Sequence, residues 1–313
     1  MLTFEGKLVS AGIFPDFEET VLFQEHDESL GFTRSTPTEG FDIYKKGTYK
    51  GDISLSNIGL KGVGELSWLA TNFSAENFLF KPEETLASAK EFDLKGDVAT
   101  DIPTTHGEDV NINWLPYVDS MFIESKEKSF DIFDKGTHQV AGLLIYTPDG
   151  LKARGTFNWE DGEMVADLFA FGNQSIKSEA TDLKIKSMST EGVALNTKNL
   201  RGHIDFDKQK GEFFANNSEE ETKMPANQYK TSLNSFEWDL ANKTLKFVAP
   251  EKDKGWFLST DAAQDSLFFE GATATYNFEK TELNVTDVSN IQVADALIMP
   301  ADGEVKVLSL IHI

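Results

Sequence analysis

Residues 51–80 (GDISLSNIGLKGVGELSWLATNFSAENFLF) align without a gap to residues 142–171 (GLLIYTPDGLKARGTFNWEDGEMVADLFAF). The offset is 91 residues, and the identities are mostly glycine, tryptophan and phenylalanine. Repeated turn glycines and aromatic anchors are typical of stacked β structure, in which neighbouring units complete one another's core. The repeat therefore indicates a stacked β architecture rather than a single catalytic centre. The matching pairs are Gly51/Gly142, Gly59/Gly150, Leu60/Leu151, Lys61/Lys152, Gly64/Gly155, Trp68/Trp159, Ala75/Ala166, Phe78/Phe169 and Phe80/Phe171.

Short runs of alternating apolar residues, bounded by glycine, occur in both copies and predict strands. Between them, Pro148-Asp149-Gly150 and Asp161-Gly162 have the residue types of tight turns. The sequence therefore predicts antiparallel hairpins. The predicted strand segments are 52–55, 64–68, 143–147 and 155–159.

The second half of the chain carries a rougher series of three hairpins, over residues 204–214, 237–247 and 275–285. Each has an alternating arm, a polar turn that contains lysine, and a second alternating arm. The apolar residues that enter the turns, Phe206, Leu240 and Phe278, are 34 and 38 residues apart, about the length of one hairpin and its connection. Alternation predicts one apolar and one polar face for each sheet.

Helical periodicity is scarce. Residues 82–95 (PEETLASAKEFDLK) have proline and glutamate at a helix start, so one short helix is predicted there. Segments 97–111 and 216–227 are predicted to be loops, and the second of these is acidic. The fold class that follows is all-β, with little helix: an elongated repeat stack of antiparallel hairpins, as a β-solenoid or an open β-jellyroll.

The expected organisation is one β-repeat region over residues 1–190, which contains both copies, and continuing hairpins over residues 191–307. No glycine/serine-rich or proline-rich linker separates these regions, so we expect one continuous stack. Neither end has the sequence of a dedicated cap, and open sheet edges are adhesive. We therefore expect the chain to be a piece of a longer protein.

Composition limits the classes of partner. The 313 residues carry a formal net charge of −23, and a polyanion repels phosphate backbones, so no nucleic acid is expected as a partner. There are no cysteines, which excludes disulfides, thiolate metal sites and cysteine catalysis. The first 20 residues lack a basic region followed by an apolar stretch, so the given chain contains no predicted signal peptide. No apolar stretch approaches the ~20 residues of a membrane helix.

Two end segments resemble a known group of proteins. Residues 291–307 (IQVADALIMPADGEVKV) and 1–17 (MLTFEGKLVSAGIFPDF), with the glycine-rich repeat, resemble segments of very large, uncharacterised β-rich repeat proteins of Bacteroidetes. This resemblance implies a location in the cell envelope or outside the cell, with further copies in the same polypeptide. It implies no catalytic residues. Residues 308–313 (LSLIHI) resemble translated sequencing-adapter sequence, as at the end of a metagenomic contig, so we expect this tail to be non-native.

A weaker resemblance links the hairpin series to the OstA-like domains of lipopolysaccharide-transport bridge proteins. Those domains are open β-jellyrolls with an apolar interior that carries lipid. The resemblance is at the level of the fold. It implies an alternative function, in which this chain shields acyl chains across the periplasm.

Polar clusters give few candidates for chemistry. His106, Glu108 and Asp109 form the one histidine–carboxylate cluster that lies on a predicted loop. The other histidines, His26, His138, His203 and His312, have no metal-ligand spacing. We interpret the His106 group as a solvated loop rather than a metal or acid–base site, and His203 as a solvent-facing strand residue.

Paired carboxylates are frequent in so acidic a chain. Asp205 and Asp207 could form a glycosidase pair or begin a calcium loop, but Lys210 stands where an EF-hand loop has glycine. Glu160, Asp161 and Glu163 form a second group. We interpret both groups as ordinary surface acid, and no catalytic, cofactor-binding or metal-binding residue is assigned.

The repeated aromatic residues favour a structural role. Trp68 and Trp159 could stack on sugars, but their matched positions at strand ends are more typical of core anchors. Phe78 with Phe80, and Phe169 with Phe171, have a spacing of two and so share one strand face. Core packing explains them, whereas a lipid-lined trough would need that face to be open.

These observations predict a non-enzymatic, structural or extended-surface binding segment of a large envelope or cell-surface protein. Two alternatives remain: a lipid-shielding periplasmic bridge, and an acidic β-solenoid that acts on or binds polysaccharide. The expected partners are the remainder of its own longer chain and a lipid or a glycan, with no cofactor.

Overall fold

A computed structural model describes residues 3–25, 28–188, 191–248 and 254–309, so His26, His312 and residues 310–313 of the predicted tail lie outside the described part. The described residues form 28 β-strands and three short 3₁₀-helices, which confirms the predicted all-β fold of antiparallel hairpins with little helix. No helix in this part is long and apolar enough to cross a membrane. The chain divides into two compact units, one of residues 1–153 with 171–173 and the other of residues 154–170 with 174–313.

The N-terminal unit contains twelve strands and one 3₁₀-helix within its described residues, and the division between the units passes through the two strands that follow. The strands are β1 (Thr3–Leu8), β2 (Phe17–Gln24), β3 (Ser29–Ser35), β4 (Phe41–Ile43), β5 (Gly47–Ser56), β6 (Gly59–Trp68), β7 (Thr71–Phe80), β8 (Thr85–Leu94), β9 (Thr105–Leu115), β10 (Ser120–Ser125), β11 (Phe130–Ile132) and β12 (His138–Thr147), with η1 (Pro116–Val118), followed by β13 (Gly150–Trp159) and β14 (Gly162–Gly172).

The C-terminal unit continues with two long strands, followed by twelve shorter strands within its described residues. They are β15 (Ser175–Lys186), β16 (Val193–Asp205), β17 (Lys210–Ala215), β18 (Thr222–Met224), β19 (Tyr229–Thr231), β20 (Phe236–Asp239), β21 (Thr244–Phe247), β22 (Gly255–Ser259), β23 (Phe268–Gly271), β24 (Thr273–Asn277), β25 (Glu282–Thr286), β26 (Ile291–Val293), β27 (Ala296–Ile298) and β28 (Val305–Val307), with η2 (Pro225–Asn227) and η3 (Ala262–Gln264).

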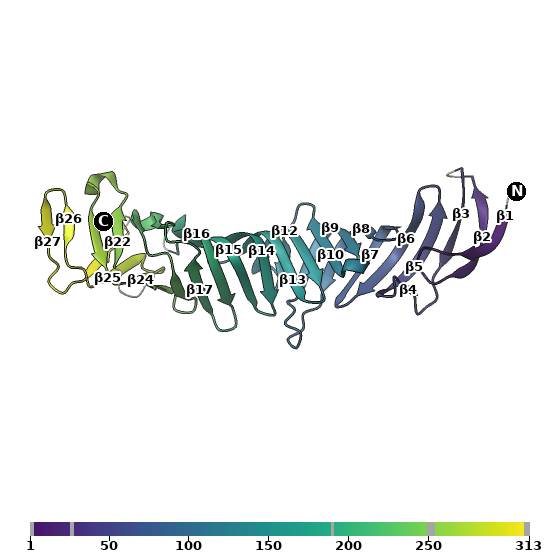
Figure 1. Ribbon diagram of the computed structural model, residues 1–313, viewed down its shortest axis with the longest axis horizontal. Helices are drawn as coiled ribbons and strands as arrows, with labels where there is room; N and C mark the ends of the chain where they lie inside the picture. Colours follow the sequence, from purple (N-terminus) through teal and green to yellow (C-terminus); the bar gives the residue numbers. More distant parts are fainter. Residues whose placement is uncertain (1–2, 26–27, 189–190, 249–253, 310–313) are drawn as a thin grey trace. The chain divides into compact units, whose positions relative to one another are not determined.

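The long strands of the N-terminal unit each belong to two sheet regions. Strands β5 to β9 pair in sequence order, side by side (Figure 1). At one end of this series β5 pairs with β4 through one half and with β3 through the other. At the opposite end β9 pairs with β11 through one half and with β10 through the other. The two halves of the long strands therefore lead into different short strands.

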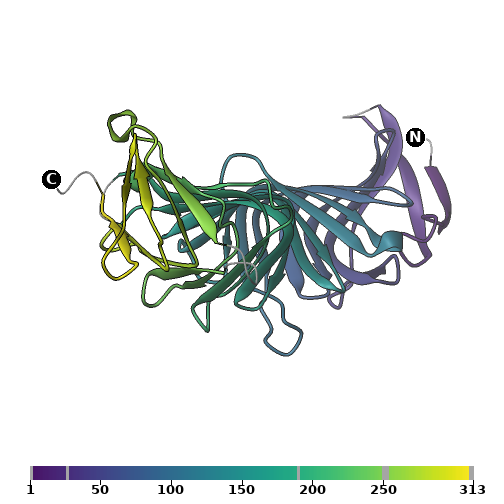
Figure 2. The ribbon, with the colours of Figure 1, turned by 60° about the vertical axis from the view of Figure 1, so that its left-hand side comes forward.

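The halves fold toward each other around an aromatic core. Tyr49, in the first half of β5, has its ring centroid 5.3 Å from that of Phe78 and 5.0 Å from that of Phe80, both in the second half of β7. By register Tyr49 pairs through Leu66 with Phe73, so these ring contacts join opposite halves of the sheet. Figure 2 shows the strands of this unit curving accordingly. The inward faces therefore pack against one another, and no second sheet is needed to cover them.

Two glycines form the bend in β5 and β6. Gly51 and Gly64 are direct partners across these strands. A Cβ on Gly51 would lie 2.2 Å from the Val63 carbonyl oxygen, and Gly51 has φ of +144°. A Cβ on Gly64 would lie 2.1 Å from the Lys50 carbonyl oxygen. Only glycine allows the backbones to approach this closely, which explains why the repeat places glycine at both positions.

The next strands bend through β-bulges. The register between β6 and β7 shifts between Gly62 and Gly64, and the β7–β8 register shifts on both sides of Ala75. At these points two consecutive residues face outward and break the alternation. We call the line of bends across β5 to β9 the bend line. It comprises Gly51, Gly64, Glu76–Asn77, Lys90–Glu91 and Glu108–Asp109.

The second repeat copy reproduces this bend. Strands β6 and β13 have identical burial patterns over all ten residues. Gly142 and Gly155, the counterparts of Gly51 and Gly64, have φ of +147° and +125°. In β14 the doublet Asp167–Leu168 replaces Glu76–Asn77. The repeat therefore preserves the residues that bend and fill the sheet.

The C-terminal unit separates into two layers at β16. The second half of β16 pairs with β17, and Asn196 in its first half pairs with β18. One layer continues through β20, β21, β24, β25 and β28, and the other through β19, β22, β23, β26 and β27. Asn227 joins the layers, because its Oδ1 accepts from the Tyr276 hydroxyl at 2.7 Å and its Nδ2 donates to the Thr281 carbonyl at 2.9 Å.

The three predicted hairpins of the second half are confirmed as β16–β17, β20–β21 and β24–β25. Their turns stack on one another. The Leu240 N–H donates to the Gln209 carbonyl of the preceding turn at 2.9 Å, and the Phe278 N–H donates to the Lys243 carbonyl at 3.0 Å. The spacing of Phe206, Leu240 and Phe278 therefore arises because successive hairpin turns stack and are joined by backbone hydrogen bonds.

These turns share an Asp or Asn whose side chain caps the backbone. The Asp239 carboxylate accepts from the Asn242 N–H at 2.9 Å, and Asp205 accepts in the same way from Lys208. The Asn242 N–H lowers the pKa of Asp239, and the Lys208 side chain lowers that of Asp205. A carboxyl whose folded pKa is depressed stabilises the fold above its unfolded pKa, and this stabilisation is lost as the pH falls through the folded pKa.

We therefore expect the melting temperature to fall on acidification below about pH 4. Asp239→Asn keeps an acceptor for the Asn242 N–H but cannot titrate, so its melting temperature should depend less on pH in this range. Thermal melts followed by circular dichroism across the acid range measure this. The control is Asp207→Asn, in an exposed turn position. An unchanged pH dependence in Asp239→Asn would contradict the capping role.

Three local predictions are wrong. Residues 82–95 contain strand β8 and no helix, because Ala87, Ala89 and Phe92 are buried against neighbouring strands and tertiary packing overrides helix propensity. The predicted loop 97–111 contains the start of β9. The predicted loop 216–227 contains β18 and η2.

Candidate functional site

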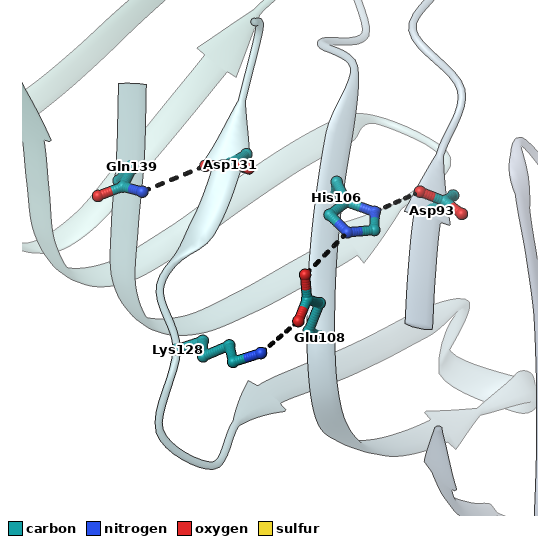
Figure 3. Close-up of polar contacts among 6 residues, drawn as sticks. All are labelled: Asp93, His106, Glu108, Lys128, Asp131 and Gln139. Atoms are coloured by element: carbon teal, nitrogen blue, oxygen red, sulfur yellow. Dashed lines mark hydrogen bonds and ion pairs between the residues drawn. The ribbon is translucent and has the colours of Figure 1, made fainter. Parts of the chain in front are cut away.

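The histidine–carboxylate cluster lies on the outer face of the N-terminal unit. His106 is on strand β9 rather than on the predicted loop, and it pairs by register with Asp93 on β8 and Asp131 on β11. Asp131 pairs in turn with Gln139 on β12. Strand register therefore brings these polar side chains into one row across four strands (Figure 3).

Ion pairs hold this cluster. His106 Nδ1 lies 2.8 Å from Asp93 Oδ1, and Nε2 lies 3.8 Å from Glu108 Oε1. The other oxygen of Glu108 accepts from Lys128, which lowers the pKa of Glu108 and raises that of Lys128. The predicted proximity of His106 to Glu108 is present, whereas Asp109 is exposed at the bend line, with φ of +51°.

The arrangement is that of a surface ion-pair network. His106 contacts the carboxylates of Asp93 and Glu108, and Lys128 contacts Glu108. His106, Glu108 and Lys128 lie around an open hollow of about 330 Å³. Within the described residues, no three His, Asp or Glu side chains form a group that could hold a metal ion. Exposed pairs of this kind contribute little to stability.

The other predicted carboxylate groups do not converge on a site. Asp205 Oδ2 binds Lys208 Nζ at 2.6 Å within its own turn, and Asp207 is exposed. Asp161 pairs with Lys243 at 2.7 Å. Glu163 pairs with Lys184, also at 2.7 Å. Each of the paired acids is thus engaged by a separate lysine, whereas glycosidase chemistry needs two carboxylates that face one substrate.

The repeated aromatic residues are in the core, as predicted. Trp68 and Trp159 are 2% and 5% exposed. Phe78, Phe80, Phe169 and Phe171 are buried, and His203 faces solvent, also as predicted. Neither tryptophan can stack on a sugar.

A second hollow, which was not among the sites predicted from the sequence, lies on the same outer face beyond the bend line. Its volume is about 330 Å³. Register places Asn111 between Ser88 and Glu124, and Asn113 between Leu86 and Phe122. We call it the outer hollow; its lining includes Asn77, Leu79, Leu86, Ser88, Asn111, Asn113, Phe122, Glu124 and Leu143.

A third, larger hollow adjoins the outer hollow. It has a volume of about 720 Å³ and shares Asn77 and Ser88 with it. Charged side chains of both signs line it, among them Lys50, Glu65 and Lys90. The outer face therefore offers a continuous recessed surface across β5 to β10.

No protein family model matches this chain. No curated protein and no solved structure matches it significantly either.

The outer hollow had one sequence signal, the alternation Asn111-Ile112-Asn113-Trp114. Ile112 and Trp114 are buried, so both asparagines face outward. Assigning residues 97–111 to a loop concealed this strand. The partners on β8 and β10 follow only from the register.

Proposed function

We propose that this chain is a non-enzymatic β-scaffold segment of a large envelope or cell-surface protein, and that it binds its partner along the outer sheet face. The observation that carries the proposal is the matched burial of the two repeat copies. Strands β6 and β13 keep every inward position buried, while several outward residues differ, as Val63 and Glu65 do from Arg154 and Thr156. Such repetition maintains packing and leaves the outer face free to vary.

The packed aromatic interior favours this function over lipid shielding. Phe78 and Phe80 stack at 5.6 Å, and Tyr49 contacts both rings. The ring centroid of Phe14 also lies 5.0 Å from that of Phe80. Rings that cover one another on several sides offer little surface to an acyl chain.

Incubation of the purified chain with isolated envelope polysaccharides tests the proposal. We expect co-sedimentation with a polysaccharide and no release of new reducing ends, because the described carboxylates of the predicted groups do not converge. Release of reducing ends would contradict the non-enzymatic assignment. Lipid extraction and mass spectrometry provide the second readout, and stoichiometric bound lipid would favour the lipid-shielding alternative instead.

A further inference from the structure

We propose that the outer hollow binds a neutral oligosaccharide, through the amides of Asn77, Asn111 and Asn113 and the ring of Phe122. This inference rests on the proposed function, because it names the class of partner for the outer face. It concerns side chains of β7 to β10 and Leu143 of β12, all within the N-terminal unit.

Hydrogen bonds within the hollow pre-orient its polar groups. The Ser88 hydroxyl donates to Asn111 Oδ1 at 2.9 Å, and the Ser88 N–H donates to Asn77 Oδ1 at 3.1 Å. Both amides thereby use their oxygen atoms within the protein. Their Nδ2 groups, each with two donors, remain available to the acceptor oxygens of a ligand.

Asn113 supplies a separate signal. Its Oδ1 is buried and accepts no hydrogen bond among the described residues. A buried acceptor without a donor is costly, so such atoms in folded proteins usually have a partner. Asn113 lines the hollow. Rotation of the amide about its χ2 bond would turn this oxygen toward the hollow, where a ligand hydroxyl would supply the missing donor.

The floor of the hollow is apolar. Leu86 and Phe122 flank Asn113 by register, and Leu79 and Leu143 complete the floor. A pyranose ring presents C–H groups on its faces and hydroxyls around its rim. An apolar floor with amides beside it matches both surfaces, as is usual for small-molecule sites.

The location favours a sugar over a peptide. Peptides commonly bind β-sheets by adding a strand to a free edge. Strand β8 is paired on both sides, with β7 and β9, and β9 is paired with β8 and β10. A ligand on this face must therefore be recognised by side chains alone, which suits a hydroxyl-rich molecule.

The adjoining hollow extends the surface across further strands. Neighbouring strands lie about 4.8 Å apart, which is close to the length of one sugar residue in an extended chain. An oligosaccharide crossing the strands would thus present one residue to each successive strand. The shared Asn77 and Ser88 connect the two hollows.

Calorimetric titration of the full chain with cellohexaose, laminarihexaose, maltohexaose and mannohexaose tests the proposal. We expect at least one to bind, and we expect Asn111→Ala and Phe122→Ala each to weaken this binding about tenfold. Asn111 is exposed, so its variant should remain folded. The matched control is Phe214→Ala, which removes a 37% exposed phenylalanine on β17 and should bind as the wild type does.

Binding of none of the four hexasaccharides would overturn the inference, as would unchanged binding by Asn111→Ala. Binding of an unstructured peptide mixture in their place, lost in Asn111→Ala, would also overturn it. The proposed function fails separately. It would be contradicted by release of reducing ends, whereas co-sedimentation with envelope polysaccharide but no hexasaccharide binding would remove only the present inference.

Discussion

Trp68→Ala is expected to lower the free energy of unfolding by about 3–5 kcal/mol, the usual cost of deleting a buried tryptophan side chain. The Trp68 ring centroid lies 5.6 Å from that of Trp114 and 5.6 Å from that of Tyr146. Trp68 ends β6, whereas its two partners are on β9 and β12. Its removal would leave a cavity between strands that meet only through the core. Urea denaturation followed by fluorescence measures the loss.

Ile58→Ala is the control, because Ile58 is 63% exposed in a turn. Its free energy of unfolding should stay within about 0.5 kcal/mol of the wild type. Trp159→Ala should lower the free energy of unfolding by a similar amount, because Trp159 is also buried. Its ring centroid lies 6.0 Å from that of Trp238 in the C-terminal unit. A wild-type denaturation midpoint in both tryptophan variants would refute their role as core anchors.

Gly51→Ala is expected to destabilise the chain by about 2–5 kcal/mol, which combines positive-φ strain with overpacking. The added Cβ would lie 2.2 Å from the Val63 carbonyl oxygen and 2.6 Å from Gly64 Cα. Both neighbours are backbone atoms, so they cannot rotate away. Separating the strands would disturb the bend, and with it the contacts between Tyr49 and the second half of β7. Chemical denaturation measures this effect.

Gly6→Ala is the matched control. A Cβ on Gly6 would meet no atom within 4 Å, and its φ lies outside the left-handed region. Replacing such a glycine usually stabilises a protein by about 0.4–1 kcal/mol, through the lower entropy of the unfolded chain. The two substitutions should therefore have opposite signs. Equal stability of the two variants would show that the Gly51 site can relax.

The predictable part of the fold was the part governed by strand periodicity and turn chemistry. Alternation located the strands around Trp68 and Trp159, and the residues Pro148-Asp149-Gly150 located a turn. Strand β8 was missed because its residues have high helix propensity, and its burial depends on partners distant in sequence. The bulge doublets were also missed, because an extra outward residue such as Asn77 in β7 disrupts the pattern that identifies a strand.

The candidate sites show the same limit. The sequence placed His106 near Glu108, but not near Asp93 or Asp131, since those neighbours come from β8 and β11. Likewise, Phe122 and Asn113 are adjacent only because β9 and β10 pair in one register. A shift of β10 by one residue in that register would turn Phe122 toward the core, while Asn113 would still face outward. The chemistry of each side chain can be inferred from the sequence, whereas the set of side chains that meet at one site depends on the register in which the strands pair.

The bend line also determines how such a chain can change by insertion and deletion. In a flat strand, one inserted residue reverses the facing of every side chain beyond it. At a doublet such as Glu76–Asn77, the backbone already accommodates an extra residue, and alternation restarts on the far side. Loss of one residue there would straighten the strand, and the buried residues on both sides of the doublet would still face the core. Single-codon changes at these positions would therefore alter curvature while preserving the core, which gives a repeated sheet a route to new outer surfaces.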